Sequence, residues 1–437
     1  MVLLKSFRNI FKITELRSKI FFVVIVLIIN RLGTYIPVIG VDVARVAETL
    51  QQSASAGGLL RYFDLFSGGA LARCTVFGLG IAPYITASIM LQILGMTVPT
   101  FEQLLKEGEY GRKIINQYTR YVTLGLSLVY GMSFAWYIEN NGLALTPGWG
   151  FRLIFTLTLA AGSMLVMWMG DQISLHGIGN GSSVILFSNL VSGYPAIVLR
   201  LIHRVQEGQV HFIMSMVVLA IFLAITALVV FLEKSERKVP IQYTRRIVGN
   251  KMYAGQSTHI PFKINSAGVM PVIFASTILT FPMMVGNLLS GYLPALKTMV
   301  DAFNSGPLYH VSEFILVIIF SFVYTALAVN PEELAEHIRK GGGFIPGLRP
   351  GKNTAQYFNY ILTRIGLVGA IYLATLSILP AVLQQVFNVP FEMSGTSMLI
   401  VVGVALELSS QIESYLIEHK YEGFLSSGRV KRSGALS

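Results

Sequence analysis

Cysteine is almost absent from this chain of 437 residues, because Cys74 is its only one. A single cysteine excludes an intramolecular disulfide and any zinc site built from cysteines. Charged residues are also scarce: they make up 13% of the sequence, against about a quarter in a typical soluble domain. Hydrophobic residues make up 53%, and the mean hydropathy is +0.63. This balance indicates a membrane protein with several spans.

Motifs for catalysis and for nucleotide or metal binding are missing as well. The loop PGLRPGKN resembles a phosphate-binding loop only in part: Pro346 occupies the position of its first glycine, and Asn353 that of the Ser or Thr that would bind magnesium. The stretch GIGNGSS, at 177–183, lacks the dinucleotide-binding spacing. No H-E-x-x-H motif occurs, and the seven histidines are scattered. We therefore expect no enzymatic activity, no metal site and no cofactor.

Ten apolar stretches are each long enough to cross a bilayer as a helix, which takes about 20 residues. They lie at 20–39, 75–97, 117–138, 153–170, 183–204, 212–232, 266–291, 312–330, 357–380 and 396–416. The fifth is the least regular, since Pro195 and Arg200 interrupt it. Together the stretches predict an all-α, polytopic membrane protein with ten transmembrane helices.

Positive charge is unevenly distributed along the chain, which has 33 Lys and Arg against 22 Asp and Glu. Most basic residues fall in the N-terminal segment, in alternate loops and in the C-terminal tail. Because cytoplasmic loops carry the excess of Lys and Arg, we expect both termini to be cytoplasmic, as an even number of spans requires. Residues 1–19 alternate basic and apolar positions at helical spacing, which predicts an amphipathic helix on the membrane surface. Residues 417–437 form a basic tail.

The ten predicted helices divide into two halves of five, 20–205 and 206–416. Because five is odd, the halves would enter the membrane in opposite directions, as an inverted pair. Many secondary transporters are built in this way, so a transporter with a broken helix is one hypothesis. Such a transporter needs polar or ionisable groups paired near the middle of the membrane. Arg31 and Glu407 lie within the spans, and the sequence offers neither an evident partner.

The stretch FDLFSGGALARCTVFGLG, at 63–80, begins apolar, breaks at Gly68-Gly69 and carries Arg73 before the second span. Its first part is too short to cross a bilayer. Glycine weakens a helix by roughly 1 kcal/mol relative to alanine, so the pair would keep this piece kinked and easily displaced. From the residues alone, the piece is either a connecting re-entrant loop or a movable gate.

Two long basic loops complete the pattern, at 233–265 and 331–356. The first alternates β-branched residues, which favours a hairpin. The second begins with a short helix capped by Asn330-Pro331 and ends in a Gly/Pro-rich turn that presents Arg349. Positive-inside bias alone would explain the charge, whereas the length and shape of the loops favour a docking surface.

Six motifs, in order along nearly the whole chain, resemble the SecY family of protein translocase channels. They are FDLFSGGALARCTVFGLGIAPYITASIMLQ, GIGNGSS, KVPIQYTRR, INSAGVMPVIFAS, GGGFIPGLRPGKNTAQY and GTSMLIVVGVALE. The resemblance implies two inverted five-helix halves around a central hourglass pore, with a short plug half-helix near 63–73. It also implies a channel in the bacterial plasma (inner) membrane that passes unfolded secretory polypeptides and releases transmembrane segments sideways into lipid.

The resemblance further assigns roles to individual residues. An aliphatic pore ring consists of Ile81, Ile85, Leu186, Ile273 and Ile400. The plug consists of Phe63, Asp64, Leu65, Phe66, Ser67, Gly68, Gly69, Ala70, Leu71, Ala72 and Arg73. Polar residues of a lateral gate are Ser88, Gln92 and Ser276. Contacts for a motor or ribosome are Arg245, Arg246 and Arg349. The spacing supports one of these points independently, since Ile81 and Ile85, four residues apart, share one face of a helix.

The expected partners also follow from the resemblance. They are the small membrane subunits SecE and SecG, the ATPase motor SecA, the ribosome, signal sequences, unfolded preproteins and membrane lipid, without DNA. An external motor is consistent with the missing nucleotide motif.

Overall fold

The computed structural model describes residues 13–43, 45–46, 64, 66–208, 211–243, 246–248, 251–253, 257–289, 307–387 and 395–433. The chain forms two compact units. Unit 1 contains residues 1–200, 283–301 and 404–437, and unit 2 contains 201–282 and 302–403. The first exchange between units, at 200–201, lies five residues before the predicted junction of the two halves.

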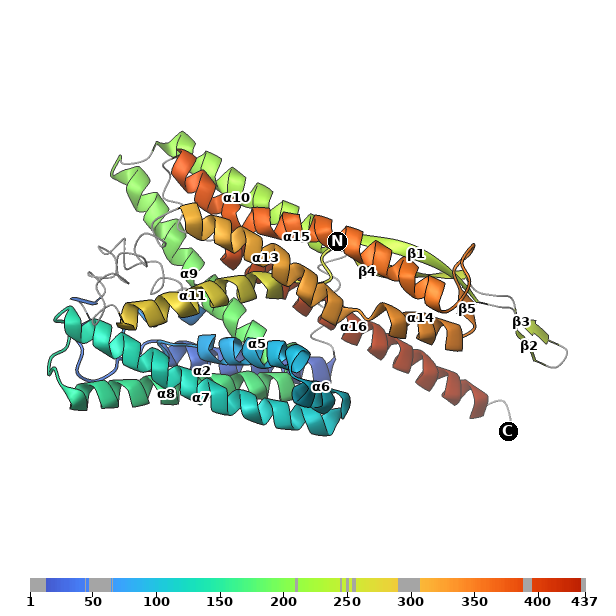
Figure 1. The fold of residues 1–437 in the computed structure, drawn as a ribbon, viewed down its shortest axis with the longest axis horizontal. Coiled ribbons are helices and arrows are strands. Elements are labelled where there is room, and N and C mark those ends of the chain that lie inside the picture. Colours follow the sequence, from blue (N-terminus) through green and yellow to red (C-terminus); the bar gives the residue numbers. More distant parts are fainter. Residues whose placement is uncertain are drawn as a thin grey trace. The chain divides into compact units, whose positions relative to one another are not determined.

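Helices form most of both units (Figure 1). Those that lie wholly or mostly in unit 1 are α2 (Thr14–Gly33), α5 (Ala82–Thr97), α6 (Pro99–Lys106), α7 (Glu109–Asn140), α8 (Trp149–His176) and α9 (Gly181–Gln206). Those that lie wholly or mostly in unit 2 are α10 (Phe212–Glu233), α11 (Met270–Leu289), α13 (Pro307–Ala328), α14 (Pro331–Lys340) and α15 (Lys352–Phe387). The last helix, α16 (Gly395–Ser433), begins in unit 2 and continues in unit 1.

Each of the ten predicted spans overlaps one long helix of the described chain, so the all-α, polytopic fold is confirmed. In this part of the chain, seven helices are long and apolar enough to cross a membrane, and the bent pair α5–α6 brings the number to eight. The pair bends by 102° at the junction before Pro99. Pro195 does not interrupt the fifth helix, because α9 continues through it.

In unit 1, α7 and α8 run side by side (Figure 1), and glycines allow the chain to pack closely around α8. A Cβ at Gly162 of α8 would lie 1.9 Å from the carbonyl oxygen of Val76. A Cβ at Gly131 of α7 would lie 3.2 Å from the Cα of Thr156. The first contact holds the chain before α5, at Val76, against α8, and the second holds α7 against α8.

In unit 2, α13 and α15 lie side by side and share an apolar core with α10, α11 and the start of α16 (Figure 1). The core includes Val229, Val272, Val317, Leu373 and Leu399, each at most 1% exposed. These residues come from five helices, so the core joins most of the unit.

The two long loops of unit 2 form a small sheet with its own core. Strand β1 (Glu236–Tyr243) pairs antiparallel with β4 (Ser257–Lys263) and with β5 (Gly343–Phe344), and a short hairpin joins β2 (Arg246–Val248) to β3 (Lys251–Tyr253). The sheet, α14 and the start of α15 enclose a loop core of Val239, Ile241, Phe262, Ala335, Ile338, Ile345, Phe358 and Leu362. The predicted hairpin and the predicted short helix are both confirmed. The side chain of Asn330 caps that helix by accepting from the amides of Glu332 and Glu333.

Candidate functional site

The predicted plug lies in unit 1, and we call its described part, Asp64 and residues 66–73, the plug segment. Phe63 and Leu65 lie outside the described residues. Asp64, Phe66 and Ser67 are helical, and the chain continues in turns from Gly68, so the helical part is shorter than 63–73. Phe66, Ala70 and Leu71 are each at most 2% exposed. The segment is therefore packed into the interior of its unit.

Hydrogen bonds within the plug segment fix its shape. The partly buried carboxylate of Asp64 accepts from the Ala72 amide at 2.7 Å, and the Asp64 carbonyl accepts from the Gly69 amide at 2.9 Å. The hydroxyl of Ser67 accepts from the Leu71 amide at 3.2 Å. Burial raises the pKa of the Asp64 carboxyl, although the Ala72 amide and the charge of Arg73 act in the opposite direction.

The end of the segment is bound to the chain that follows α2. The Val38 amide donates to the Cys74 carbonyl at 2.8 Å, and the Val76 amide donates to the Ile36 carbonyl at 3.0 Å. The Arg73 guanidinium lies 4.6 Å from the centre of the Tyr35 ring. Cys74 is fully buried and has a left-handed φ of 47°, which a non-glycine residue rarely adopts.

Arg31, for which the sequence offered no evident partner, contacts a backbone carbonyl and an aromatic ring. Its Nη1 donates to the Gly68 carbonyl at 2.9 Å, and its guanidinium lies 5.5 Å from the centre of the Tyr35 ring. Asn189 of α9 donates from Nδ2 to the Phe66 carbonyl at 3.0 Å. Sequence analysis missed Asn189, because an uncharged amide in an apolar helix gives no signal and the acceptor belongs to the backbone.

The five predicted ring residues are distributed over both units. Ile81, Ile85 and Leu186 belong to unit 1, and Ile273 and Ile400 to unit 2. All except Ile85 are at most 5% exposed. The Ile81 side chain packs toward α8, since a Cβ at Gly170 would lie 3.5 Å from its Cδ1. These residues are aliphatic and come from four elements, α5 with its N-cap, α9, α11 and α16; the closed ring itself stays a prediction.

The three predicted gate residues make hydrogen bonds within their own helices. Gln92 donates from Nε2 to the Ser88 hydroxyl at 3.3 Å, one turn apart on α5. Ser276, which is 2% exposed, donates to the Ile273 carbonyl at 3.0 Å on α11. Ser88 and Gln92 lie in unit 1 and Ser276 in unit 2, so the gate also stays a prediction.

Of the predicted docking residues, Arg349 is described most fully. It is exposed, its carbonyl accepts from the Thr354 hydroxyl at 3.1 Å, and it lies in the turn between β5 and α15. Gly347 and Gly351, with φ of 84° and 104°, allow the chain to turn on either side of it. Arg246 begins β2, and Arg245 lies outside the described residues. The loop core thus supports a turn that displays a guanidinium.

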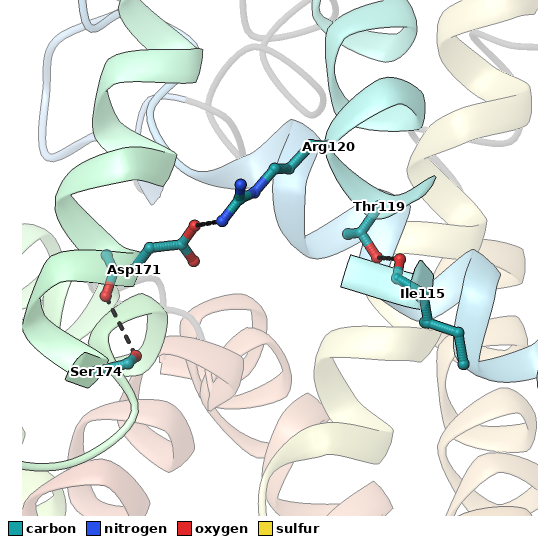
Figure 2. Close-up of polar contacts among 6 residues, drawn as sticks. Ile115, Thr119, Arg120, Asp171 and Ser174 are labelled. Carbon is teal, nitrogen blue, oxygen red and sulfur yellow. Dashed lines mark hydrogen bonds and ion pairs between the residues drawn. The ribbon is translucent and has the colours of Figure 1, made fainter. Parts of the chain in front are cut away.

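Sequence analysis also missed two polar interactions of the long helices. Arg120 of α7 donates from Nη2 to Oδ2 of Asp171 on α8 at 2.7 Å (Figure 2). Glu313 of α13, 5% exposed, accepts from the Thr396 hydroxyl at 3.3 Å. Glu407, for which the sequence offered no evident partner, accepts at 3.5 Å from the Gln411 side chain one turn away, because residues four apart face each other on a helix.

The described residues contain no group of three or more His, Cys, Asp and Glu side chains that could hold a metal ion.

Solved structures with the same fold are channels. The chain has a TM-score of 0.65, at 16% identity, to a structure described as that of a protein conducting channel, with 91% of this chain and 92% of that chain covered. It has a TM-score of 0.60, also at 16% identity and with the same coverage, to a structure of a SecY protein described by how its plug domain stabilises the closed state. The chain therefore has the fold of these channel structures, and its long apolar helices are those of a multi-pass membrane protein.

The family follows from sequence comparison. The family model described as SecY matches residues 75–409. The chain is 39% identical over 429 residues to the protein translocase subunit SecY of Escherichia coli (strain K12), covering 96% of both proteins. It is 40% identical over 426 residues to the protein translocase subunit SecY of Aquifex aeolicus, covering 96% of this chain and 98% of that protein. The chain belongs to the SecY family.

Proposed function

We propose that this chain is the central protein-conducting channel subunit of a bacterial Sec translocase. It passes unfolded secretory polypeptides across the membrane and releases transmembrane segments sideways into lipid. The observation that carries the proposal is the plug segment, which is buried and too short to span a bilayer, in a chain that matches translocase subunits over 96% of its length.

The proposed pore narrows at the ring of Ile81, Ile85, Leu186, Ile273 and Ile400. A short hydrophobic constriction closes to ions by losing its water. Aliphatic side chains also adapt to a passing chain of any sequence, because they need no specific polar partner. Burial of four of the five side chains supports a constriction that is closed at rest.

The plug segment is proposed to close the pore from the external side. Its burial and its internal hydrogen bonds support a compact piece that is displaced as a unit. One solved structure with this fold is of a SecY protein whose plug domain stabilises the closed state of its translocation channel and maintains a membrane seal. Sideways release is proposed to involve the lateral-gate residues Ser88, Gln92 and Ser276.

Energy is proposed to come from partners, and the chain itself is proposed to act as a channel without a catalytic step. Arg349, on the turn supported by the loop core, and Arg245 and Arg246 of the hairpin are the proposed contacts for the motor SecA or for the ribosome. Arginine binds carboxylates and phosphates in a bidentate manner, which suits either partner. One solved structure with this fold is a yeast Ssh1 complex bound to the yeast 80S ribosome.

The remaining assignments complete the proposed complex. SecE and SecG are the proposed small membrane subunits, and signal sequences and unfolded preproteins are the substrates. The chain is proposed to reside in the bacterial inner membrane with both termini in the cytoplasm, since the basic loops, the N-terminal segment and the tail would lie on that side.

Photocrosslinking tests the channel against a secondary transporter. We expect a photoreactive residue at position 81 or 273 to crosslink to a stalled secretory chain, because both ring positions face the translocating polypeptide. Position 213 is the control, since Ile213 of α10 is 78% exposed in the described structure and faces away from its packed core. A secretory chain that crosslinks to none of the ring positions, while the complex remains intact, would refute the channel.

A further inference from the structure

Two carbonyl groups of the plug segment are bound by side chains from distant parts of unit 1. The Phe66 carbonyl accepts from Asn189 Nδ2 of α9 at 3.0 Å. The Gly68 carbonyl accepts from Arg31 Nη1 of α2 at 2.9 Å. Both donors therefore bind the main chain of the segment, and they approach it from two different helices.

These carbonyls lie where a short helix ends. The last carbonyls of a helix lack intrahelical partners and need other donors. Gly68 and Gly69, with φ of 70° and 82°, turn the chain directly after Ser67. A Cβ at Gly68 would lie 3.0 Å from Arg31 Nη1 and 3.1 Å from the Asn189 carbonyl. Glycine at this position thus allows the two helices to reach the backbone.

Asn30 orients one of the two donors. Its Nδ2 donates to Asn189 Oδ1 at 3.0 Å, and both amides are 2% exposed. Because that oxygen is occupied, the Asn189 amide presents its NH₂ group to the Phe66 carbonyl. The Tyr35 ring, 5.5 Å from the Arg31 guanidinium, lies against the other donor. Both donors are therefore also held by contacts with residues outside the plug segment.

We propose that Arg31 and Asn189, with Asn30 as a positioning residue, form a latch that holds the plug segment closed by binding its backbone. This inference rests on the proposed function, because a latch has a role only if the segment seals a channel. Losing one donor removes a hydrogen bond from the buried backbone of the plug segment. We expect this to shift the closed-to-open ratio about tenfold toward open.

The test uses the reconstituted complex with Arg31→Met. Methionine is unbranched like arginine but is apolar, so the substitution removes the hydrogen-bond donor. We expect about tenfold more resting ion conductance and export of a reporter with a defective signal sequence, while a reporter with an intact signal is still exported. Arg17→Met is the matched control, since Arg17 is an exposed arginine of the same helix. Unchanged conductance in Arg31→Met would overturn the latch.

Deletion of residues 64–73 separates a latch from a general effect on the channel wall. If Arg31 acts through the plug segment, Arg31→Met adds nothing to the conductance of the deletion variant. An equal increase in both backgrounds would show that Arg31 shapes the wall, and would overturn the proposal. The same comparison applies to Asn189→Ala.

A second pair of variants tests the close approach at Gly68. Gly68→Ala and Gly69→Ala both place a Cβ at a left-handed φ, but only the first brings it to 3.0 Å from Arg31 Nη1; at Gly69 the nearest atom is Arg73 Nη2 at 3.7 Å. We expect Gly68→Ala to increase conductance clearly more than Gly69→Ala. Equal conductance in the two variants would contradict the latch.

Spin-label distances test the latch without relying on export. Labels at positions 72 and 145 report on the segment relative to an exposed loop of the same unit. Cys74 does not compete for the label, since burial raises the pKa of its thiol to about 12. We expect one narrow distance in the unmodified protein and a second, displaced population in Arg31→Met. A single, unchanged distance in Arg31→Met would overturn the latch. Failure of the unmodified complex to export the reporter with an intact signal would instead overturn the channel function.

Discussion

At the scale of a single residue, opposing effects act on the pKa of the Asp64 carboxyl. Its carboxylate accepts from the Ala72 amide and lies near the charge of Arg73, which both favour the ionised form, whereas burial favours the neutral form more strongly. The net result is a raised pKa in the packed plug segment. A displaced segment would return the carboxyl to its ordinary pKa of about 4.

In the proposed channel, this difference would make closure dependent on external pH. Because the packed state has the higher pKa, it binds the proton more tightly, so acid favours it. The contribution is fully present below about pH 4 and is lost as the pH rises through the raised value. We expect resting ion conductance to fall when the external solution is acidified from pH 7 toward pH 4, measured in planar bilayers.

Asp64→Asn keeps an oxygen that can accept from Ala72 but does not titrate. We expect its conductance to show no such pH dependence, whereas the control Asp42→Asn, in the chain after α2, keeps it. A variant at position 64 that still follows the pH would assign the effect to another group.

The residues of the candidate site differ in how far the sequence could predict them. The Gly68-Gly69 pair and Arg73 mark the segment because their types are unusual before an apolar span. The partner of Arg31 could not be predicted, since it is a backbone carbonyl 37 positions away. Every residue has a backbone carbonyl, so the sequence does not mark which one Arg31 binds. The same holds for Asn189, whose acceptor lies 123 positions away.

At the scale of elements, the contact between α8 and the chain after the plug segment depends on Gly162. Because Gly162 has no side chain, the Val76 carbonyl can approach it so closely that a Cβ at Gly162 would lie 1.9 Å from the carbonyl oxygen. A backbone group cannot rotate aside as a flexible side chain can. The position of Val76, and with it the end of the plug segment, is therefore set by the absence of one methyl group.

Gly162→Ala should force these two elements apart. Overpacking of this kind typically costs about 1–3 kcal/mol, so we expect a lower melting temperature in detergent and an increased resting conductance. Gly125→Ala is the control: Gly125 is also inside a membrane helix, α7, and a Cβ there meets nothing within 4 Å. Equal melting temperatures for the two variants would show that the α8 contact relaxes freely.

The helices themselves were largely predictable, because length and hydropathy are local properties of the sequence. Their ends were less so. The predicted spans begin at 117 and 357, whereas α7 begins at Glu109 and α15 at Lys352. Both helices begin in polar sequence before the apolar stretch, where hydropathy does not mark them but helical hydrogen bonding is already present. The sharp bend before α6 was likewise hidden, since Pro99 permits either a loop or the first turn of a new helix.

At the scale of the whole molecule, a net charge of +11 is gathered largely in loops and termini, and the proposed partners would meet it there. Arg349→Glu replaces an attractive contact with a repulsive one on a turn outside the membrane helices. We expect the complex to insert and assemble normally but export driven by purified SecA to slow at least tenfold in reconstituted vesicles. Arg17→Glu changes the net charge equally at an exposed position of α2 and should have little effect. Equal export rates for the two variants would remove Arg349 from the docking surface.

The turn that carries Arg349 leads directly into α15, and this continuity has a mechanical consequence. Phe358 and Leu362 anchor the start of α15 in the loop core, and its first proline is Pro380. About 28 residues, or about 42 Å of helix at 1.5 Å per residue, lie between the start of α15 and that proline. This exceeds the roughly 30 Å thickness of a membrane's hydrocarbon layer. If a motor docks at the turn as proposed, a force applied there would act on one continuous helix that is longer than the membrane is thick, and on α13, which packs along it.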